Sequence, residues 1–458
     1  MDKAMLKTIV RLTIPAITEY SLQTLLNYAD YVMVGDLGVT ASAAIGLTSE
    51  VTWLLKGSVS AVSVGVLAYI AAAIGAGEKK QIKTASVQAV FASLTIGAVM
   101  MILSLVLAPF IPVWLGADNN ITKAAGGYFA VANSTFLFLS MNMVLGSAIK
   151  ASGDMKTSLY INGGVNILNI ILNYFLIYPS RTLYLFSHRL QIVGAGMGVY
   201  GAAAGTALST VAGGILMLAA LYRSPLLSPK GCSKKLDKTI IKEYVSVGIP
   251  SMLTRFTNSS GRIIFTAIVA QLGTLMYSAH TISFTAESAF YIPCVGMMSV
   301  VSTMAGNIKG EGNREKLDRL TKMFCIIASS VMLIMSVLMF IFADGLFKIF
   351  TNDEYVLSTA PHLLKIAAVN EPFFAVSLIL ESIFNGIGKT KLPFAASAVS
   401  QWTFRVGGSI ICLKVLGFGV EAAWVCMISD NIFRCILLAA AYRFSKKDHI
   451  GHKKCAVE

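Results

Sequence analysis

Apolar residues gather along this chain in long blocks, most of about twenty residues or more, between short charged or glycine-rich stretches. A helix needs about 20 mostly apolar residues to cross the hydrocarbon core of a bilayer. The pattern therefore predicts membrane-spanning helices. Breaking the chain at its charged and Gly- or Pro-rich points gives twelve spans, over residues 9–34, 45–75, 84–110, 121–149, 157–178, 194–221, 241–268, 280–306, 317–343, 357–385, 393–415 and 418–443.

The charges between these spans alternate from loop to loop. Most Lys and Arg residues fall in the N-terminal segment, in every second loop and in the C-terminal tail. Basic residues in short loops mark the cytoplasmic side of a membrane protein. The asymmetry predicts that both termini are cytoplasmic, and it accounts for the net charge of +14 without nucleic acid as a partner. The basic residues of the opposite side are Lys123, Arg181, Arg189, Lys348 and Lys414.

The composition agrees with a multi-pass membrane protein. Of the 458 residues 55% are hydrophobic and 13% charged, whereas a soluble domain carries about a quarter charged residues. The mean hydropathy is +0.71. The seven cysteines are scattered, without a CxxC pair or a His/Cys spacing typical of zinc, so we expect no cofactor. The first apolar block contains Glu19 and Asp30 and is expected to be a retained helix, not a signal peptide.

The two halves of the chain align at an offset of 235 residues, which matches Pro15 with Pro250 and Gly153 with Gly388; after a longer loop near 179–193 the offset becomes 220. Six spans in each half imply parallel repeats, related by an axis along the membrane normal. We therefore expect an all-α polytopic membrane protein whose twelve transmembrane helices form two six-helix bundles with pseudo-two-fold symmetry and a cleft between them. The expected parts are a bundle over 1–221, a cytoplasmic linker over 222–240, a bundle over 241–443 and a cytoplasmic tail over 444–458.

Polar side chains inside the spans of the first half follow helical periodicity. Glu19, Gln23, Asn27 and Asp30 are spaced by four, four and three residues, so they share one helical face. A charge at the bilayer centre costs about 2.5–3.5 kcal/mol and persists where it is paired or useful. A second stripe with the same kind of spacing comprises Asn162, Asn166, Asn169 and Asn173. Together with Thr206, the two stripes predict an oxygen-rich pocket for a proton or Na+, unless the amides only bridge helices.

The second half carries both acids and arginines in its spans. By depth, Arg262 is expected to pair with Glu287, and Arg405 with Glu371. These pairs are either structural or able to open and release a carboxylate. Aromatic faces attract cations, and Tyr31 is one of the aromatic residues inside the spans.

Short segments at corresponding helix ends of the two halves suggest a family. The first helix contains Thr13-Ile14-Pro15 and ends in an Asp followed by a Gly–x–x–Gly exit. With it, the segments 27–38, 74–78, 148–154, 306–313 and 384–390 resemble, in order and spacing, the multidrug and toxic compound extrusion (MATE) family. The resemblance covers nearly the whole chain.

The resemblance implies an antiporter that exports small organic cations, often aromatic, in exchange for H+ or Na+ by alternating access. It places ion coupling at Asp30, Gln23, Asn169, Asn173 and Thr206, with a Na+ site at the same residues except Gln23. Because Asn173 stands where some members have a second acid, we favour H+ and leave Na+ open. Asn258 stands where many members have a glutamate. The expected substrate cavity comprises Glu19, Asn27, Tyr31, Asn166, Asn258, Glu287 and Glu371.

Two other functions compete with this interpretation. A flippase for lipids or lipid-linked oligosaccharides belongs to the same superfamily but usually has two more helices. A membrane-embedded enzyme is disfavoured, because the five histidines form no HExxH and no acidic pair suggests metal-dependent transfer. We therefore expect no enzymatic activity, and a monomer in the plasma membrane of a prokaryote.

Overall fold

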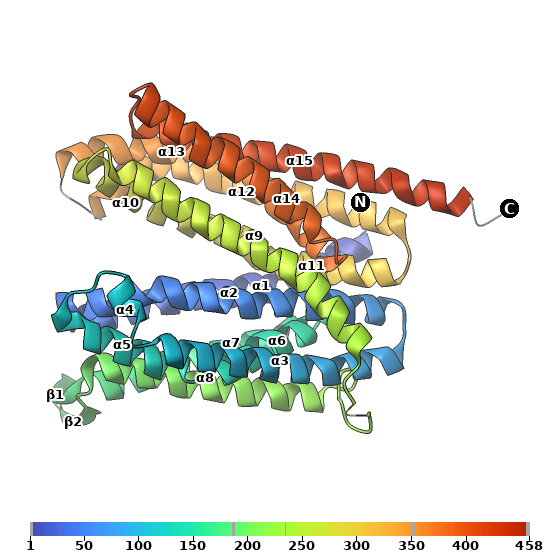
Figure 1. The fold of residues 1–458 in the computed structure, drawn as a ribbon, viewed down its shortest axis with the longest axis horizontal. Helices are drawn as coiled ribbons and strands as arrows, with labels where there is room; N and C mark the ends of the chain where they lie inside the picture. The colour runs from blue at the N-terminus through green and yellow to red at the C-terminus, as the bar shows by residue number, and fades with distance from the viewer. Residues whose placement is uncertain (1–2, 186–187, 234, 350, 352, 455–458) are drawn as a thin grey trace. The chain divides into compact units, whose positions relative to one another are not determined.

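The structure, a computed structural model, describes residues 3–185, 188–233, 235–349, 351 and 353–454 (Figure 1). Long helices dominate it, as the apolar blocks predict. The first half contains α1 (Lys3–Gly35), α2 (Val39–Gly75), α3 (Lys79–Leu107), α4 (Ile111–Trp114), α5 (Asn119–Asn133), α6 (Phe136–Ala151), α7 (Met155–Ile177), β1 (Pro179–Leu185), β2 (His188–Ala195) and α8 (Gly198–Arg223). The second half contains α9 (Lys238–Ala270), α10 (Thr274–Phe290), α11 (Ile292–Gly310), α12 (Arg314–Leu346), η1 (Phe347–Ile349), α13 (Glu354–Gly386), α14 (Lys391–Ser400), η2 (Gln401–Gly408), η3 (Ile411–Val415) and α15 (Val420–Lys454).

Each predicted span is formed by one helix or by consecutive helices, and the short α4 and η1 fall between spans. Within the described residues, seven helices are long and apolar enough to cross a membrane alone, and two bent pairs raise the number to nine. The other three spans are α1, α9 and the run from α14 to η3, which carry ionisable residues such as Asp30, Arg255 and Arg405. The prediction of an all-α, twelve-span membrane fold is confirmed.

Two predicted spans are bent, which the apolar pattern did not reveal. The α5–α6 pair bends by 46° and the α10–α11 pair by 49°. Pro293 follows the second break, where its ring and missing N–H prevent a continuous helix. At the first break the Ser134 hydroxyl donates to the Val131 carbonyl at 2.7 Å, a local bond that competes with the helical ladder.

Helix bounds reproduce the internal repeat. Both α1 and α9 have 33 residues, and α9 begins 235 residues after α1. The turns that precede α2 and α10 use Gly38 and Gly273 at φ values of 95° and 110°, where other residues are strained. The repeat is therefore visible in the backbone as well as in the sequence.

The chain forms two compact units. The N-terminal unit is Val10–Val245, and the C-terminal unit is Ser246–Glu458 together with Met1–Ile9. The division falls inside α9, beyond the linker expected at 222–240, because the start of α9 packs on the N-terminal unit. Tyr244 is buried there and its hydroxyl donates to the Ala85 carbonyl at 2.8 Å.

An antiparallel hairpin, β1–β2, occupies the longer loop near 179–193, for which the sequence analysis proposed no strands. It lies at the same end of the N-terminal unit as α4 (Figure 1). Arg181 contacts two tyrosine rings at the base of the hairpin. Its guanidinium carbon lies 4.2 Å from the ring centre of Tyr174 and 4.3 Å from that of Tyr178. The Tyr178 hydroxyl donates to Asp36 at 2.8 Å, which ties this base to the end of α1.

Candidate functional site

Asp30, near the end of α1, accepts hydrogen bonds from two asparagines of α7. Asn173 Nδ2 donates to Asp30 Oδ1 at 2.9 Å. In the amide orientation that satisfies its surroundings, Asn169 Nδ2 donates to both Asp30 oxygens at 3.0 Å, and its own oxygen accepts from the Thr206 N–H of α8 at 3.3 Å. The structure thus brings together four of the five residues assigned to ion coupling, which we name the Asp30 site.

The Asp30 site is largely enclosed within the N-terminal unit. Asn173 is 1% exposed, and Asp30 and Thr206 are half-buried. Asn173 Oδ1 is buried and accepts no hydrogen bond from the described residues. A buried acceptor without a partner costs about 1–3 kcal/mol, so the site has an oxygen available for a cation or for a protonated carboxyl.

Glycines let α7 and α8 approach closely enough to form this site. Gly201 and Gly205 are one turn apart on α8, a spacing of small residues that favours close helix packing in membranes. A Cβ at Gly201 would overlap the Leu176 carbonyl, and one at Gly205 would overlap the Asn173 side chain. The position of Asn173 therefore depends on the absence of a side chain at Gly205.

Asp30 forms no ion pair with any described Lys, Arg or His side chain. Its described hydrogen-bond partners are neutral amides. A buried carboxylate without a fixed counter-charge is held by these hydrogen bonds alone. Its protonation or its binding of a cation is thus not opposed by a permanent positive neighbour.

Glu19, a predicted cavity residue, has the opposite surroundings. Its Oε1 accepts from Lys150 Nζ at 2.8 Å, from Ser158 at 3.0 Å and from Asn162 at 2.6 Å. Asn162 in turn accepts from Asn142 Nδ2 at 3.1 Å. This pair was not predicted, because Lys150 lies in the last turn of α6, next to a loop; it joins α1 to the end of α6 and the start of α7.

The remaining first-half candidates are dispersed. Gln23 and Asn27 are exposed and Asn166 is half-buried. None of these three side chains forms a hydrogen bond with another described residue. The side chain of Tyr31 lies outside the described part of the chain. Gln23 lies two turns before Asp30 on α1 and is not in contact with the Asp30 site through any described hydrogen bond.

A buried charge cluster organises the C-terminal unit. Asp430 is 0% exposed and pairs with Arg405 Nε at 2.9 Å and with Arg434 Nη2 at 3.1 Å. The predicted pairing of Arg405 with Glu371 is therefore wrong. Arg405 lies on the π-helical η2, whose wider turns change the direction of its side chains relative to a regular helix. The spacing of Asp430 and Arg434, four residues apart on α15, is the sequence signal that the analysis overlooked.

The other acids of this unit are buried. Glu371 is 0% exposed, and neither of its carboxyl oxygens has a hydrogen-bond partner among the described residues. Glu287 is also buried, and its Oε2 has no such partner. Glu287 forms no ion pair with a described side chain, so the predicted pair with Arg262 is not formed. Asn258 accepts through its backbone carbonyl from Gln401 Nε2 at 3.0 Å. These three cavity candidates belong to the C-terminal unit, whereas the Asp30 site belongs to the N-terminal unit.

No group of three His, Cys, Asp or Glu side chains converges within the described residues. The Asp30 site differs from such a metal centre because its oxygens come from one carboxylate, amides and a hydroxyl. Such oxygens suit a hard monovalent cation as well as a proton.

Comparisons with known proteins agree on one kind of molecule. The MatE family model matches residues 15–175 and 250–411. The chain is 28% identical over 438 residues to the Thermotoga maritima protein named "Probable multidrug resistance protein NorM", which covers 94% of this chain and 90% of that one. It is 22% identical to "Multidrug export protein MepA" of Staphylococcus aureus, over 89% of this chain and 86% of the relative. A solved MATE structure in a straight conformation shares the fold, with a TM-score of 0.88, 24% identity and 96% of each chain covered.

Proposed function

This chain belongs to the MatE family, and from that premise we propose that it is an antiporter that exports small organic cations in exchange for H+ by alternating access. Its relatives are named as multidrug resistance or export proteins and are transporters, not enzymes. The coupling ion, the cationic substrate and a cytoplasmic location of both termini are the specific parts of this proposal.

The observation that supports coupling most strongly is the environment of Asp30. The carboxylate is enclosed between three helices, is held only by neutral amides and has an unpartnered acceptor, Asn173 Oδ1, beside it. Keeping such a group in a membrane domain is costly. Reversible neutralisation by an ion removes that cost in one of two states, which is what an ion-coupled cycle requires.

Two features favour H+ over Na+. Both amide nitrogens already point at the Asp30 oxygens, so a cation at that position would meet N–H donors. Protonation instead requires one further acceptor, and rotation of the Asn173 amide by half a turn would present its oxygen to the new O–H. Na+ remains the alternative, with Asp30, Asn169, Asn173 and Thr206 as its ligands.

The proposed substrate class rests on the polar residues left without ion pairs. Gln23 and Asn27 are exposed on the same helix as Asp30, and Glu371 in the C-terminal unit has no described partner. Carboxylates and amides offer acceptors to a cationic drug and none of the positive charge that an anionic substrate would need.

Proteoliposomes test the coupling directly. Efflux of ethidium is measured under a proton gradient and, separately, under a sodium gradient, for the wild type and for Asp30→Asn. We expect the wild type to respond to the proton gradient and Asp30→Asn to lose gradient-driven efflux while still binding ethidium. Asp36→Asn is the matched control, because that carboxylate lies near the same end of α1 but bonds to Tyr178. Full efflux by Asp30→Asn would reject the assignment, and a response only to sodium would replace H+ by Na+.

The substrate class is tested by competition in the same vesicles. Organic cations should reduce ethidium efflux, whereas neutral analogues of equal size should not. The reverse pattern contradicts a cation exporter. Transbilayer movement of a fluorescent lipid, with no effect on ethidium, would support the flippase instead.

A further inference from the structure

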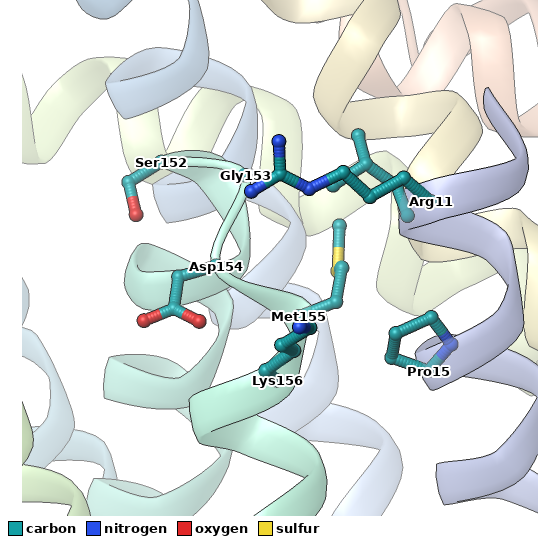
Figure 2. Close-up of a pocket in the computed structure, with 8 residues that line it drawn as sticks. Arg11, Pro15, Ser152, Gly153, Asp154, Met155 and Lys156 are labelled. Carbon is teal, nitrogen blue, oxygen red and sulfur yellow. The ribbon is translucent and has the colours of Figure 1, made fainter. Parts of the chain in front are cut away.

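A cavity of about 220 Å³ opens in the N-terminal unit between the first turns of α1 and the turn that joins α6 to α7. We name it the α1–α7 pocket. Its lining combines two cations, Arg11 and Lys156, with the apolar side chains of Leu12, Pro15 and Met155. Figure 2 shows Arg11 reaching from α1 towards Gly153 of the turn, and Lys156 rising from the first turn of α7.

The two cations of the pocket are not neutralised by the protein. Neither Arg11 nor Lys156 forms an ion pair with a described side chain. Asp154 lines the same pocket, but its carboxylate accepts from Thr157 N at 3.0 Å and from Thr157 Oγ1 at 2.6 Å. In Figure 2 this carboxylate points away from Arg11. An anion between Arg11 and Lys156 would therefore meet positive charge on two sides.

Leu12, Pro15 and Met155 form the apolar part of the lining beside the turn at Ser152–Asp154, and exposed hydrophobic residues follow on both helices. Ile14 lies three residues after Arg11 on α1 and is 61% exposed, and Tyr160 lies four residues after Lys156 on α7 and is 72% exposed. Exposed tyrosine is typical of the membrane interface. A free phosphate needs only the cations, whereas a phospholipid also uses the apolar part, so the lining favours a lipid.

The repeat supplies an internal comparison. At the offset of 235, Ser246 stands in place of Arg11, and Thr390 in place of Met155. Thr390 Oγ1 donates to the Val247 carbonyl at 2.8 Å, which connects the turn to α9 at the position of the pocket. Among the described residues the C-terminal unit thus has one cation fewer at the corresponding position, and a hydrogen bond connects the turn to α9 there.

We propose that the α1–α7 pocket binds the phosphate headgroup of an anionic phospholipid. Arg11 and Lys156 neutralise the phosphate, while the half-buried Leu12 and Pro15 contact the glycerol and the first part of an acyl chain. Basic pockets between helices, at the membrane face rich in Lys and Arg, attract such headgroups. The lipid would join α1 to α7, the two helices that carry Asp30 and its asparagine partners.

Native mass spectrometry of the purified chain tests the proposal. Phosphatidylglycerol and phosphatidylcholine are titrated separately, and the affinity of the first bound lipid is compared between wild type and Arg11→Gln/Lys156→Gln. We expect the double variant to lose roughly tenfold or more in affinity for phosphatidylglycerol and to bind phosphatidylcholine as before. Lys79→Gln/Lys80→Gln is the matched control, since it removes two exposed lysines from the same basic side outside the pocket.

The outcomes separate a lipid from other anions. Binding of phosphatidylglycerol that persists in 10 mM inorganic phosphate supports a lipid site, whereas displacement of the lipid by phosphate overturns the proposal. Wild-type affinity in the double variant, or equal loss in the control, also overturns it. A photoreactive phosphatidylglycerol adds a measurement on unmodified protein: label in the peptides around Arg11 or Met155 supports the site, and label only elsewhere contradicts it.

Discussion

The substitution Gly205→Ala tests whether the geometry of the Asp30 site depends on the close approach of α8 to α7. An alanine Cβ would overlap Asn173 Oδ1 and lie 3.2 Å from both its Cγ and its backbone nitrogen. Since the backbone atom cannot give way independently, the carboxamide must move by on the order of 1 Å to restore ordinary contact. That movement takes Asn173 Nδ2 away from Asp30, to which it now donates at 2.9 Å.

The free-energy cost follows from two opposing effects. Overpacking costs about 1–3 kcal/mol, and losing a hydrogen bond to a charged acceptor costs about 1.5–3 kcal/mol. Alanine recovers up to about 1 kcal/mol through its better helix propensity. Because the first two costs share one displacement and do not simply add, we expect a net destabilisation of about 2 kcal/mol.

The assay combines thermal unfolding in detergent with gradient-driven efflux in liposomes. Gly205→Ala should lower Tm and change the pH dependence of transport, because Asp30 loses one of its donors. Gly164→Ala on α7 is the matched control, since a Cβ there meets nothing within 4 Å, and it should leave both properties unchanged or slightly raise Tm. Wild-type stability and an unaltered pH profile in Gly205→Ala would refute the dependence of the Asp30 site on this helix contact.

Three further predictions concern the charge clusters and the thiols. Lys150→Met should lower the free energy of unfolding by about 3 kcal/mol, because Glu19 stays buried without its cation. The double variant Glu19→Gln/Lys150→Met should recover most of this loss. Thermal unfolding that shows no recovery contradicts the explanation. Asp430→Ala should destabilise more than Arg434→Ala, because it leaves two buried guanidinium groups unpaired instead of removing one; equal Tm values would argue against this. Oxidation should join Cys412 to Cys426, whose sulfurs are 3.7 Å apart and would lie about 2.05 Å apart in a disulfide. The intact mass after oxidation is compared with that of Cys412→Ser, which cannot form this bond. An unchanged mass of the wild type contradicts the proximity of the two thiols.

The helical framework could be predicted from the sequence because the bilayer imposes a minimum apolar length on every span. Glycines that need positive φ, such as Gly38 and Gly273, mark the same turns in both halves. The bends were not predictable in the same way. The break at Ser134 depends on local hydroxyl bonds, and that at Tyr291 on one proline, neither of which interrupts the apolar pattern.

Side-chain pairing was less predictable than the positions of the helices. Helical spacing placed Asp30 on one polar stripe and Asn169 and Asn173 on another, and the family resemblance assigned ion coupling to these residues and to Thr206. The pairing of Lys150 with Glu19 was not predictable, because a long flexible side chain at a helix end can reach back into the membrane region. Arg405 was assigned to the wrong acid because depth along a helix does not fix its rotation, and the π-helical turns of η2 change that rotation.

The repeat shows how the two units differ at the positions of the Asp30 site. At offsets of 235 and 220, the positions of Asp30, Asn169, Asn173 and Thr206 are taken by Phe265, Phe404, Gly408 and Cys426. Phe265 is 2% exposed and packs against His280 at a ring distance of 5.5 Å. Apolar packing thus replaces the polar site at these positions of the C-terminal unit, where Asp430 forms a separate buried cluster with Arg405 and Arg434. Because Asp430 pairs with two arginines, this cluster suits a rigid scaffold, whereas Asp30, among neutral amides, suits the proposed gain and loss of an ion.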